Sequence, residues 1–419
     1  MNFIQKTQRS RPQMALLSAI HALIMIGGLI FYFSLPYSMA DEITLVEITS
    51  AIKHALFGIE EKPPRDRYAF VNVSWEKELI DKLDSNDFKI GQMDITNRKS
   101  LGKLVKAVND NPGHEYMLID VRFYDPAPTD SLLSAELKKA EKLVVSYHKG
   151  ADDKPHYPIF ECNVGLSDME SQVRSNIDDI ILKYNIIQND SLKTTPLVIY
   201  EGIHKKGYQS GLVFGNLDGN MVLNTFVMDY LIWDYDLFQA KAYNYYQLGE
   251  LLMLEEFSPG TIAEYFEDRI VIVGDFEDTD MHKTSKGEMH GPLILLNAFL
   301  ALERGYNVIS WGFLIFLFAS FFIISYKALT IKDPVTNYLR RKLPSDHFMI
   351  EMASDALFYL AYFAIVSIIS YMLFNIQLTI LILATYVWAI EKAVISIDEL
   401  LEEKQKAKEK KLEESIETE

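Results

Sequence analysis

A run of acidic residues and histidines occupies positions 275 to 290 of the chain. Its oxygen and nitrogen donors are Asp275, Glu277, Asp278, Asp280, His282, Glu288 and His290. A flexible loop can gather several such donors around a divalent cation, and a cation held in this way can activate water for hydrolysis. The spacing, however, matches neither HExxH nor paired CxxC motifs. We therefore expect no bound metal, and a solvated acidic loop is the simpler interpretation.

Other catalytic signatures are missing from the sequence as well. It contains no GxxxxGK[ST] phosphate loop and no GxSxG nucleophile elbow, so we predict no catalytic residues and no cofactor. The net charge of -17 argues against a nucleic-acid partner, because a phosphate-binding surface needs concentrated Lys and Arg. The single cysteine, Cys162, leaves no intramolecular disulfide to stabilise a domain.

The residues that flank the acidic loop predict structural roles. A buried strand at 270–273 ends at Gly274, where the backbone must turn tightly. Gly291 and Pro292 begin an apolar helix, since proline's missing N–H is tolerated in a first helical turn. Asn297 lies inside this helix, and a buried amide must find a hydrogen-bond partner or destabilise the fold. We expect it to bond to a neighbouring backbone.

A second polar group follows the predicted strand at 116–121. Asp120 and Arg122 stand at its carboxyl end, which is where α/β sheets often bind ligands. Together with Asp275, Asp280 and His282 they form our predicted ligand-binding set. A structural ion pair at the strand end is the alternative interpretation of Asp120 and Arg122.

The elements that must position these residues alternate between strands and helices. Short apolar runs rich in β-branched and aromatic residues predict strands at 68–73, 116–121, 143–146, 197–200 and 270–273. Amphipathic patterns predict helices at 98–109 and 130–141, the second with Asp130 as a capping residue. The predicted fold is an α/β domain over residues 38–306, in which a mixed or parallel sheet is covered by helices.

Four apolar segments are long enough to cross a membrane, since about 20 helical residues span roughly 30 Å of hydrocarbon. They lie at 14–36, 307–326, 355–374 and 378–397. A cleaved signal peptide is the alternative for the first segment. Within the segments, His21 is expected to be neutral and to face another helix, with a proton-linked role as the alternative. Glu391 and Lys392 are expected to snorkel towards the cytoplasmic end.

Basic residues predict the orientation of these segments, because Lys and Arg beside a span stay in the cytoplasm. They gather at 6–11, 327–342 and 404–411. This places the N-terminus (1–13), a loop (327–353) and a charged tail (398–419) in the cytoplasm. The domain at 38–306 is then extracytoplasmic. A disulfide-free domain of this kind suits a multi-pass protein of the bacterial inner membrane, with its large domain in the periplasm.

Several stretches resemble the type-two CHASE family, the cyclase/histidine-kinase-associated sensory extracellular domains. They are RYAFVNV (67–73), DITNRKSLGKLV (94–105), LIDVRF (118–123), PLVIYE (196–201), and DRIVIVGDFEDTDMH with HGPLILLNAFLALERG (268–305). In the last block, Gly274, Asp275, Asp280, Gly291 and Asn297 fall on the family's pattern. The resemblance implies one N-terminal span, a large extracytoplasmic α/β domain, usually three later spans, and a signal-sensing role without catalysis.

The chain departs from the family after the last span. Family members commonly carry an effector domain there, whereas this sequence ends with DELLEEKQKAKEKKLEESIETE. We predict that this tail continues the fourth span as a charged helix, either a solvated helix end or a docking segment.

These observations predict a membrane-anchored sensory protein that signals to a separate cytoplasmic effector. Its other predicted partner is an unidentified extracytoplasmic ligand or protein, and a homo-oligomer is a further option. One alternative function is a metal-dependent extracytoplasmic hydrolase that uses the turn at 275–290. The other is a structural subunit of a membrane complex.

Overall fold

The computed structural model divides the chain into two units. Residues 36–38 and 54–308 form an α/β unit, and residues 1–35, 39–53 and 309–419 form a helical unit. The structure describes residues 11–33, 42, 44–49, 52, 62–83, 86, 88–169, 180–189, 191–211, 214–277, 280–330 and 348–416. Asp278, most of the predicted loop at 327–353 and both chain ends lie outside the described residues.

The α/β unit is built on a seven-stranded sheet with the strand order β15-β1-β16-β4-β5, in which β6 and β7 both pair with β5. Its strands are β1 (Tyr68–Asn72), β4 (Tyr116–Asp120), β5 (Leu143–Lys149), β6 (Pro155–His156), β7 (Val164–Leu166), β15 (Asn244–Gln247) and β16 (Ile270–Gly274). Only the β5–β6 pair is antiparallel. The mixed sheet confirms the predicted α/β class, and β1, β4, β5 and β16 confirm the predicted strands that begin at 68, 116, 143 and 270.

Nearly continuous apolar runs form these strands because both faces of the sheet are covered. In β1 and β16, Phe70 and Ile272 belong to one buried cluster. Their neighbours Val71 and Val273 belong to the cluster on the opposite face. The period-two alternation of strand side chains therefore supplies two separate cores from one sheet.

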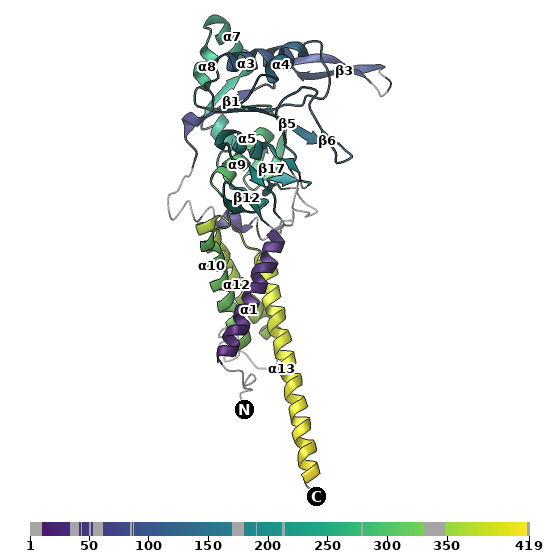
Figure 1. Ribbon diagram of the computed structural model, residues 1–419, viewed down its shortest axis with the longest axis vertical. Helices are drawn as coiled ribbons and strands as arrows, with labels where there is room; N and C mark the ends of the chain where they lie inside the picture. Colours follow the sequence, from purple (N-terminus) through teal and green to yellow (C-terminus); the bar gives the residue numbers. More distant parts are fainter. Residues whose placement is uncertain are drawn as a thin grey trace. The chain divides into compact units, whose positions relative to one another are not determined.

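Helices cover both faces of this sheet (Figure 1). On one face lie α3 (Arg98–Asp110), α4 (Asp130–Leu137), α7 (Leu248–Phe257) and α8 (Thr261–Phe266). On the other lie α5 (Thr195–His204) and α9 (Gly291–Glu303). The predicted helix at 130–141 is shorter than expected, and its N-cap residue is Thr129. The carboxylate of Asp130 instead accepts a hydrogen bond from the Ala127 N–H at 2.7 Å.

The strand predicted at 197–200 is wrong, because these residues form the middle of α5. Their β-branched, apolar character resembles a buried strand, yet Pro196 stands in the first turn of a helix, where proline is tolerated. A Cβ atom on Gly202 would lie 2.2 Å from the Tyr116 ring. The helix therefore packs very closely against β4, and this close packing buries the apolar run.

Short elements complete the unit. They are η1 (Arg65–Arg67), α6 (Asp234–Phe238), the hairpin β2 (Lys77–Leu83) with β3 (Lys89–Thr96), the pair β17 (Met281–Thr284) with β18 (Gly287–His290), the pair β8 (Lys183–Asn185) with β14 (Thr225–Val227), the pair β9 (Ile187–Gln188) with β10 (Leu192–Lys193), and the sheet β11 (Tyr208–Gln209), β12 (Gly215–Leu217) and β13 (Asn220–Val222). The β17–β18 pair forms from the sequence predicted as an acidic turn, and it leads directly into α9.

The helical unit contains α1 (Arg11–Phe33), α10 (Trp311–Thr330), α12 (Phe348–Phe374) and α13 (Ile380–Ile416). Among the described residues, four segments are long and apolar enough to cross a membrane: Arg11–Phe33, Trp311–Leu329, Ala356–Phe374 and Ile380–Ile397. They indicate a multi-pass membrane protein. As predicted, α13 runs without a break from the fourth segment into the charged tail.

Polar side chains inside the helical unit contact one another across helices. His21 Nδ1 of α1 lies 2.8 Å from the Ser325 hydroxyl of α10, which agrees with the expectation that this histidine faces another helix. The prediction that Glu391 snorkels is wrong. It is buried in the bundle, where its carboxylate accepts a hydrogen bond from the Tyr359 hydroxyl at 2.9 Å. This bond satisfies a charge that would otherwise be costly in an apolar bundle.

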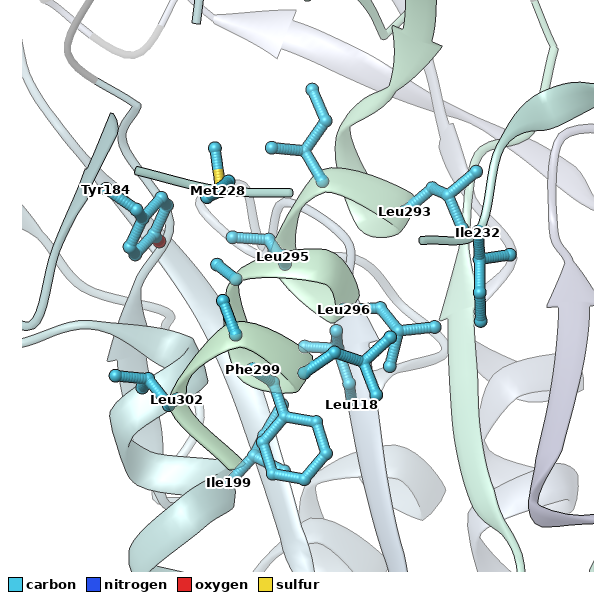
Figure 2. Close-up of a cluster of buried hydrophobic side chains, with 14 of the residues drawn as sticks. Leu118, Tyr184, Ile199, Met228, Ile232, Leu293, Leu295, Leu296, Phe299 and Leu302 are labelled. Carbon is cyan, nitrogen blue, oxygen red and sulfur yellow. The ribbon is translucent and has the colours of Figure 1, made fainter. Parts of the chain in front are cut away.

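The helix α9 is apolar around its whole circumference, and every residue from Gly291 to Leu302 is buried. Such a helix belongs in a core. Figure 2 shows its side chains packed against residues from several other elements, with Leu118 of β4 and Ile199 of α5 among them. At 13 residues the helix is too short to cross a membrane.

Asn297 is the polar exception inside α9. Its Oδ1 accepts hydrogen bonds from the Leu231 N–H at 2.8 Å and the Ile232 N–H at 3.1 Å. Its Nδ2 donates to the carbonyl oxygens of Ile232 and Leu293, both at 2.8 Å. The amide thus satisfies the backbone of an irregular buried segment, which is the role that burial of an amide demands.

We predict that Asn297→Leu destabilises the protein by roughly 3 kcal/mol, because it leaves two buried N–H groups and one carbonyl unpaired at about 1–3 kcal/mol each, partly offset by apolar burial. Chemical denaturation of the full chain in detergent measures the change. Asn216→Ala, at an exposed asparagine that contacts the Gly219 N–H, is the matched control and should change stability by less than about 1 kcal/mol. Equal effects of the two variants would contradict this role for Asn297.

Candidate functional site

The carboxyl ends of the parallel strands bring polar residues to one edge of the sheet. Asp120 ends β4, and Asp275 directly follows β16. His148 lies near the end of β5, and Asp168 follows β7. Because parallel neighbours share the same direction, these residues gather where ligands usually bind in open α/β sheets. We call Asp120, His148, Asp168, Asp280 and His282 the carboxyl-edge site.

Asp120 is the most perturbed acid of the carboxyl-edge site. Burial, together with repulsion from the nearby Asp280 carboxylate, raises its pKa to about 6. His148, a hydrogen bond from Ser146 and His282 partly oppose this rise. The side chains at 148, 280 and 282 therefore lie within electrostatic reach of Asp120. Two neighbouring carboxylates with one raised pKa are a recurrent feature of functional sites.

Local structure holds Asp280 in place. Its carbonyl oxygen accepts a hydrogen bond from the Gly291 N–H at 2.9 Å, and its carboxylate lies 3.2 Å from Nε2 of His282 on β17. A Cβ atom on residue 291 would lie 2.1 Å from the Asp280 carboxylate. A Cβ on Gly274 would similarly lie 2.4 Å from Pro292. Glycine is therefore required at both positions, because a side chain there would collide with Asp280 or Pro292 at the start of α9.

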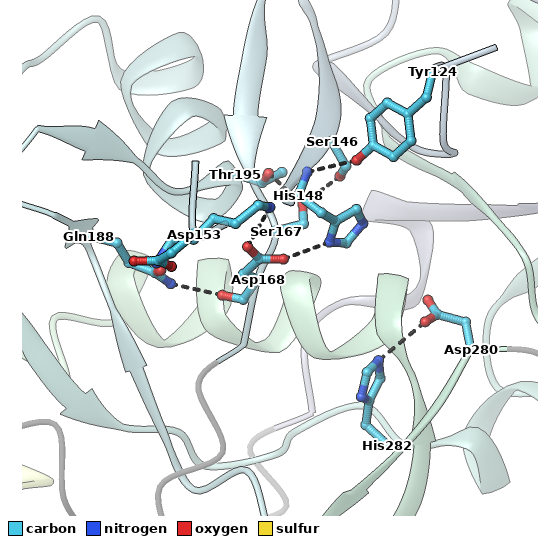
Figure 3. A network of polar contacts seen from close by, with 11 residues as sticks. Tyr124, Ser146, His148, Asp153, Ser167, Asp168, Gln188, Thr195, Asp280 and His282 are labelled. Atoms are coloured by element: carbon cyan, nitrogen blue, oxygen red, sulfur yellow. Dashed lines mark hydrogen bonds and ion pairs between the residues drawn. The ribbon is translucent and has the colours of Figure 1, made fainter. Parts of the chain in front are cut away.

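His148 and Asp168 form a second pair (Figure 3). His148 Nδ1 lies 2.9 Å from Asp168 Oδ1, while Asp168 Oδ2 accepts a bond from the Lys149 N–H at 2.7 Å. Burial lowers the pKa of His148, but Asp168 and Asp120 outweigh this effect, so the pKa is raised overall. Asp168 thereby orients the imidazole and favours its protonated form.

A chain of hydroxyl groups leads from Thr195 of α5 through Ser167 to Ser146 (Figure 3). The Ser167 hydroxyl donates to the Ser146 hydroxyl at 2.6 Å. The Thr195 hydroxyl lies 2.8 Å from Ser167 and completes the chain at the first residue of α5. Ser146 is then free to donate to Asp120. The first turn of α5 is therefore linked to the perturbed acid through hydrogen bonds alone.

Two buried polar atoms beside this network have no hydrogen-bond partner within the described part of the chain. They are the Tyr184 hydroxyl and the Gln188 side-chain carbonyl oxygen. Burial raises the pKa of Tyr184 well above its ordinary value, and the carboxylates of Asp120 and Asp168 add to that rise. Gln188 uses its Nε2 to donate to the Asp168 carbonyl oxygen at 2.8 Å. Buried polar atoms without a partner are rare in folded proteins and require an explanation.

The structure brings together three of the five residues in the predicted ligand-binding set. Asp120, Asp280 and His282 lie together as described above. Asp275 turns towards β2, where it accepts a hydrogen bond from the Ser74 hydroxyl and pairs with Lys77 at 3.5 Å. Arg122 is exposed.

The alternative prediction of an ion pair between Asp120 and Arg122 is not met among the described residues. The carbonyl oxygen of Arg122 accepts hydrogen bonds from the buried guanidinium of Arg98 at 3.3 and 3.4 Å. Arg98 also pairs with Asp130 at 3.6 Å.

The donors of the acidic turn go to separate partners. Glu277 lies 3.3 Å from the Asn72 amide nitrogen, and Glu288 is exposed. His290 Nδ1 contacts Asp234 at 3.0 Å. Across the described ranges, no three His, Cys, Asp or Glu side chains meet in a group that could hold a metal ion.

His148 and Asp168 were not among the predicted site residues. His148 lies beyond the apolar part of its strand, which was predicted to end at 146 but continues to Lys149. The signal for it was a polar SYHKG sequence directly after LVV. Asp168 follows a strand of only three residues, which gives no periodic signal in the sequence.

Comparisons of the chain with models of protein families, with curated proteins and with solved structures found no match. The resemblance to the type-two CHASE family therefore rests on the sequence stretches quoted above, and it stays a prediction.

We predict that Asp120→Asn stabilises the protein most at neutral and alkaline pH. The native carboxyl group holds its proton up to a pKa of about 6, whereas in the unfolded chain it loses the proton near 4. The stability of the wild-type protein therefore falls relative to that of the variant as the pH rises from about 4 to 6. At higher pH the difference between their free energies of unfolding stays constant. The expected gain at pH 8 is about 3 kcal/mol.

Thermal unfolding of both full-length proteins across this pH range measures the effect. Asp94→Asn, at an exposed acid of β3, is the matched control and should change stability by less than about 0.5 kcal/mol. A pH-independent difference for Asp120→Asn would contradict the raised pKa of Asp120.

Proposed function

We propose that the chain is a membrane-anchored sensory protein. In this proposal the α/β domain is extracytoplasmic and binds a ligand at the carboxyl-edge site. A change in the packing of the membrane helices then passes the signal to a separate cytoplasmic effector. The observation that carries the proposal is the carboxyl-edge site, which lies in a domain between the first and second candidate membrane spans.

Of the two edges of the sheet, only the carboxyl edge has features that support a binding role. At the amino edge, Arg67 is bidentate to Glu115 at 2.8 and 3.0 Å and contacts both carboxylate oxygens of Glu303 at 2.6 Å. Its charge is thus matched by fixed partners, as expected for a structural contact. At the carboxyl edge, Asp120 instead faces another carboxylate, Asp280. Charge that the protein leaves unbalanced there is available to a ligand.

The sidedness in this proposal follows from the basic segments. Residues 6–11, 327–342 and 404–411 collect Lys and Arg next to the candidate spans. The positive-inside rule assigns all three to the cytoplasm, and four spans satisfy this assignment together. The α/β domain then lies on the opposite side of the membrane. The type-two CHASE resemblance implies the same arrangement.

The helix α13 offers a route for the signal. Its 37 residues correspond to roughly 55 Å of continuous helix. The apolar part ends at Ile397, so the charged remainder extends past the candidate span. A displacement of the span would move this remainder with it, and an effector could read that movement. A ligand shifts such an equilibrium only if it binds the two arrangements with different affinity.

Reporter insertions test the sidedness. Alkaline phosphatase, which folds only outside the cytoplasm, is inserted after Asp152 in the exposed turn between β5 and β6. We expect an active enzyme there and an inactive one at the matched position after Lys342. A fluorescent protein fused after Glu419 should fluoresce in the same cells. Inactive phosphatase at 152, together with fluorescence from a cytoplasmic reporter inserted there, would overturn the sensory proposal.

A further inference from the structure

The hairpin of β2 and β3 exposes apolar side chains to water. In Figure 1 it extends away from the sheet and helices of the α/β unit. Within the described ranges, its two strands pair only with each other. Leu79 of β2 and Ile90 of β3 are exposed by 68% and 59%. A two-stranded hairpin is only marginally stable in water, so this one gains stability when a further strand joins it.

The two edges of the hairpin are not equally open to a further strand. The pairing skips Ile90, which is an extra residue of β3 opposite the step from Lys82 to Leu83. Such a bulge twists an edge and hinders its pairing with another strand. In contrast, β2 pairs without interruption from Lys77 to Lys82. The outer edge of β2 is therefore the one that can accept a strand.

The backbone of β2 has hydrogen-bonding groups along this outer edge. The Glu76 carbonyl oxygen accepts a hydrogen bond from the Asn97 N–H at 2.8 Å, on the side of β3. Backbone groups of successive strand residues alternate between the two edges. The N–H and C=O groups of residues 77, 79 and 81 consequently point to the outer edge, where no other strand of the described chain pairs with them.

The sequence of β2 is complementary to a second copy of itself. When two copies run antiparallel about a two-fold axis at Leu79, this residue faces its own counterpart, and Lys77 faces the partner's Asp81. Glu76 then faces the partner's Lys82. Opposite charges and apolar side chains stabilise a strand pair when they face each other. Shifting one strand by two residues, the smallest step that keeps each side chain on its face, would set Leu79 opposite a charge.

We propose that the outer edge of β2 binds the same edge of a second copy of the chain, so that two hairpins form one four-stranded antiparallel sheet. Its strand order is β3-β2-β2-β3. The contact is isologous, as in most two-fold dimers. Trp75, which is exposed by 74%, adds apolar area where the paired strands end. The inference goes beyond the proposed function, because it concerns assembly and holds whichever side of the membrane the domain faces.

An unrelated strand fits this edge less well than a second copy. Charged residues on an edge strand normally prevent accidental pairing. The charges of β2 are matched only by a strand with the reverse order of charges, and β2 itself has that order. Within the chain, Lys77 lies 3.5 Å from Asp275 and Asp81 lies 2.5 Å from Lys89. These ion pairs are accessible to solvent, so exchanging them for pairs between copies costs little.

Cysteine cross-linking of the full-length protein in membranes tests the proposal, in a Cys162→Ala background that removes the native thiol. Leu79→Cys should cross-link to its counterpart with the short thiol reagent dibromobimane, because the facing Cα atoms lie about 5.5 Å apart. Asp81→Cys alone should not, because its counterpart lies four residues along the strand, about 13 Å away. Chains with Lys77→Cys and chains with Asp81→Cys, carrying different tags, should form a mixed cross-link when they are co-expressed.

Charge reversal provides a second test that needs no cross-linking. Lys77→Glu and Asp81→Lys should each weaken dimerisation in detergent roughly tenfold, as measured by analytical ultracentrifugation. The double variant restores opposite charges between the copies and should recover wild-type dimerisation. Within one chain it leaves Asp275 and Lys89 each beside a like charge, so recovery reports the contact between copies. Glu264→Lys, at an exposed acid of α8, is the matched control and should have no effect.

Three results would overturn the proposal. They are the absence of a Leu79→Cys dimer, equal cross-linking by Asp81→Cys alone, and a double charge variant that dimerises no better than the single ones. A cross-link from Leu79→Cys to a different protein in place of a dimer would also contradict it. None of these results bears on the sensory proposal, which is decided by the sidedness of the domain.

Discussion

The pairing of β16 between β1 and β4 is the constraint on which the α/β unit depends. Val273 pairs with Val71 on one side and with Ile119 on the other, so a strand near the end of the domain joins two strands from its beginning. The segment that follows β16 must then cross the carboxyl edge. This crossing brings Asp280 towards Asp120, although 160 positions in the sequence separate them. The candidate site is thus a direct consequence of strand order.

The helix α9, which follows the β17–β18 pair, holds this arrangement in place. Because α9 is buried all round, its start is held tightly, and Gly291 and Gly274 allow the close contacts with Asp280 and Pro292. Asn297 then satisfies the backbone of the buried segment at 231–232. The acid Asp280 is consequently attached to a rigid part of the core. Placing a binding residue on such a rigid support lowers the cost of ordering it when a ligand arrives.

Much of the scaffold could be predicted from the sequence, because a strand that is buried on both faces of a sheet has a continuous apolar sequence. The runs at 68–72, 116–120 and 270–274 carried that signal. The run at 197–200 carried the same signal for a different reason, since a helix packed against both the sheet and α9 is equally apolar. Hydrophobicity alone does not separate these cases, and Pro196 was the residue that favoured a helix.

The site was predictable only where a polar residue follows a recognisable strand. Asp120 and Asp280 flank strands with strong patterns, and both were predicted. Asp168 follows a three-residue strand and Tyr184 lies in another, and the pairing of both strands depends on distant parts of the chain. Their approach to Asp120 is a tertiary effect that no local pattern records. The same holds for Glu391, whose burial depends on Tyr359 of another helix.

The central claim is that the fold forces the Asp120 and Asp280 carboxylates together. Infrared difference spectroscopy of the full-length protein tests it most directly, by following the protonated-carboxyl band that disappears in Asp120→Asn. The account predicts that this band titrates with a pKa of about 6 and that the pKa falls in Asp280→Asn. A titration near 4 in the wild-type protein, the ordinary value for aspartate, or a pKa that is unchanged in Asp280→Asn would contradict it.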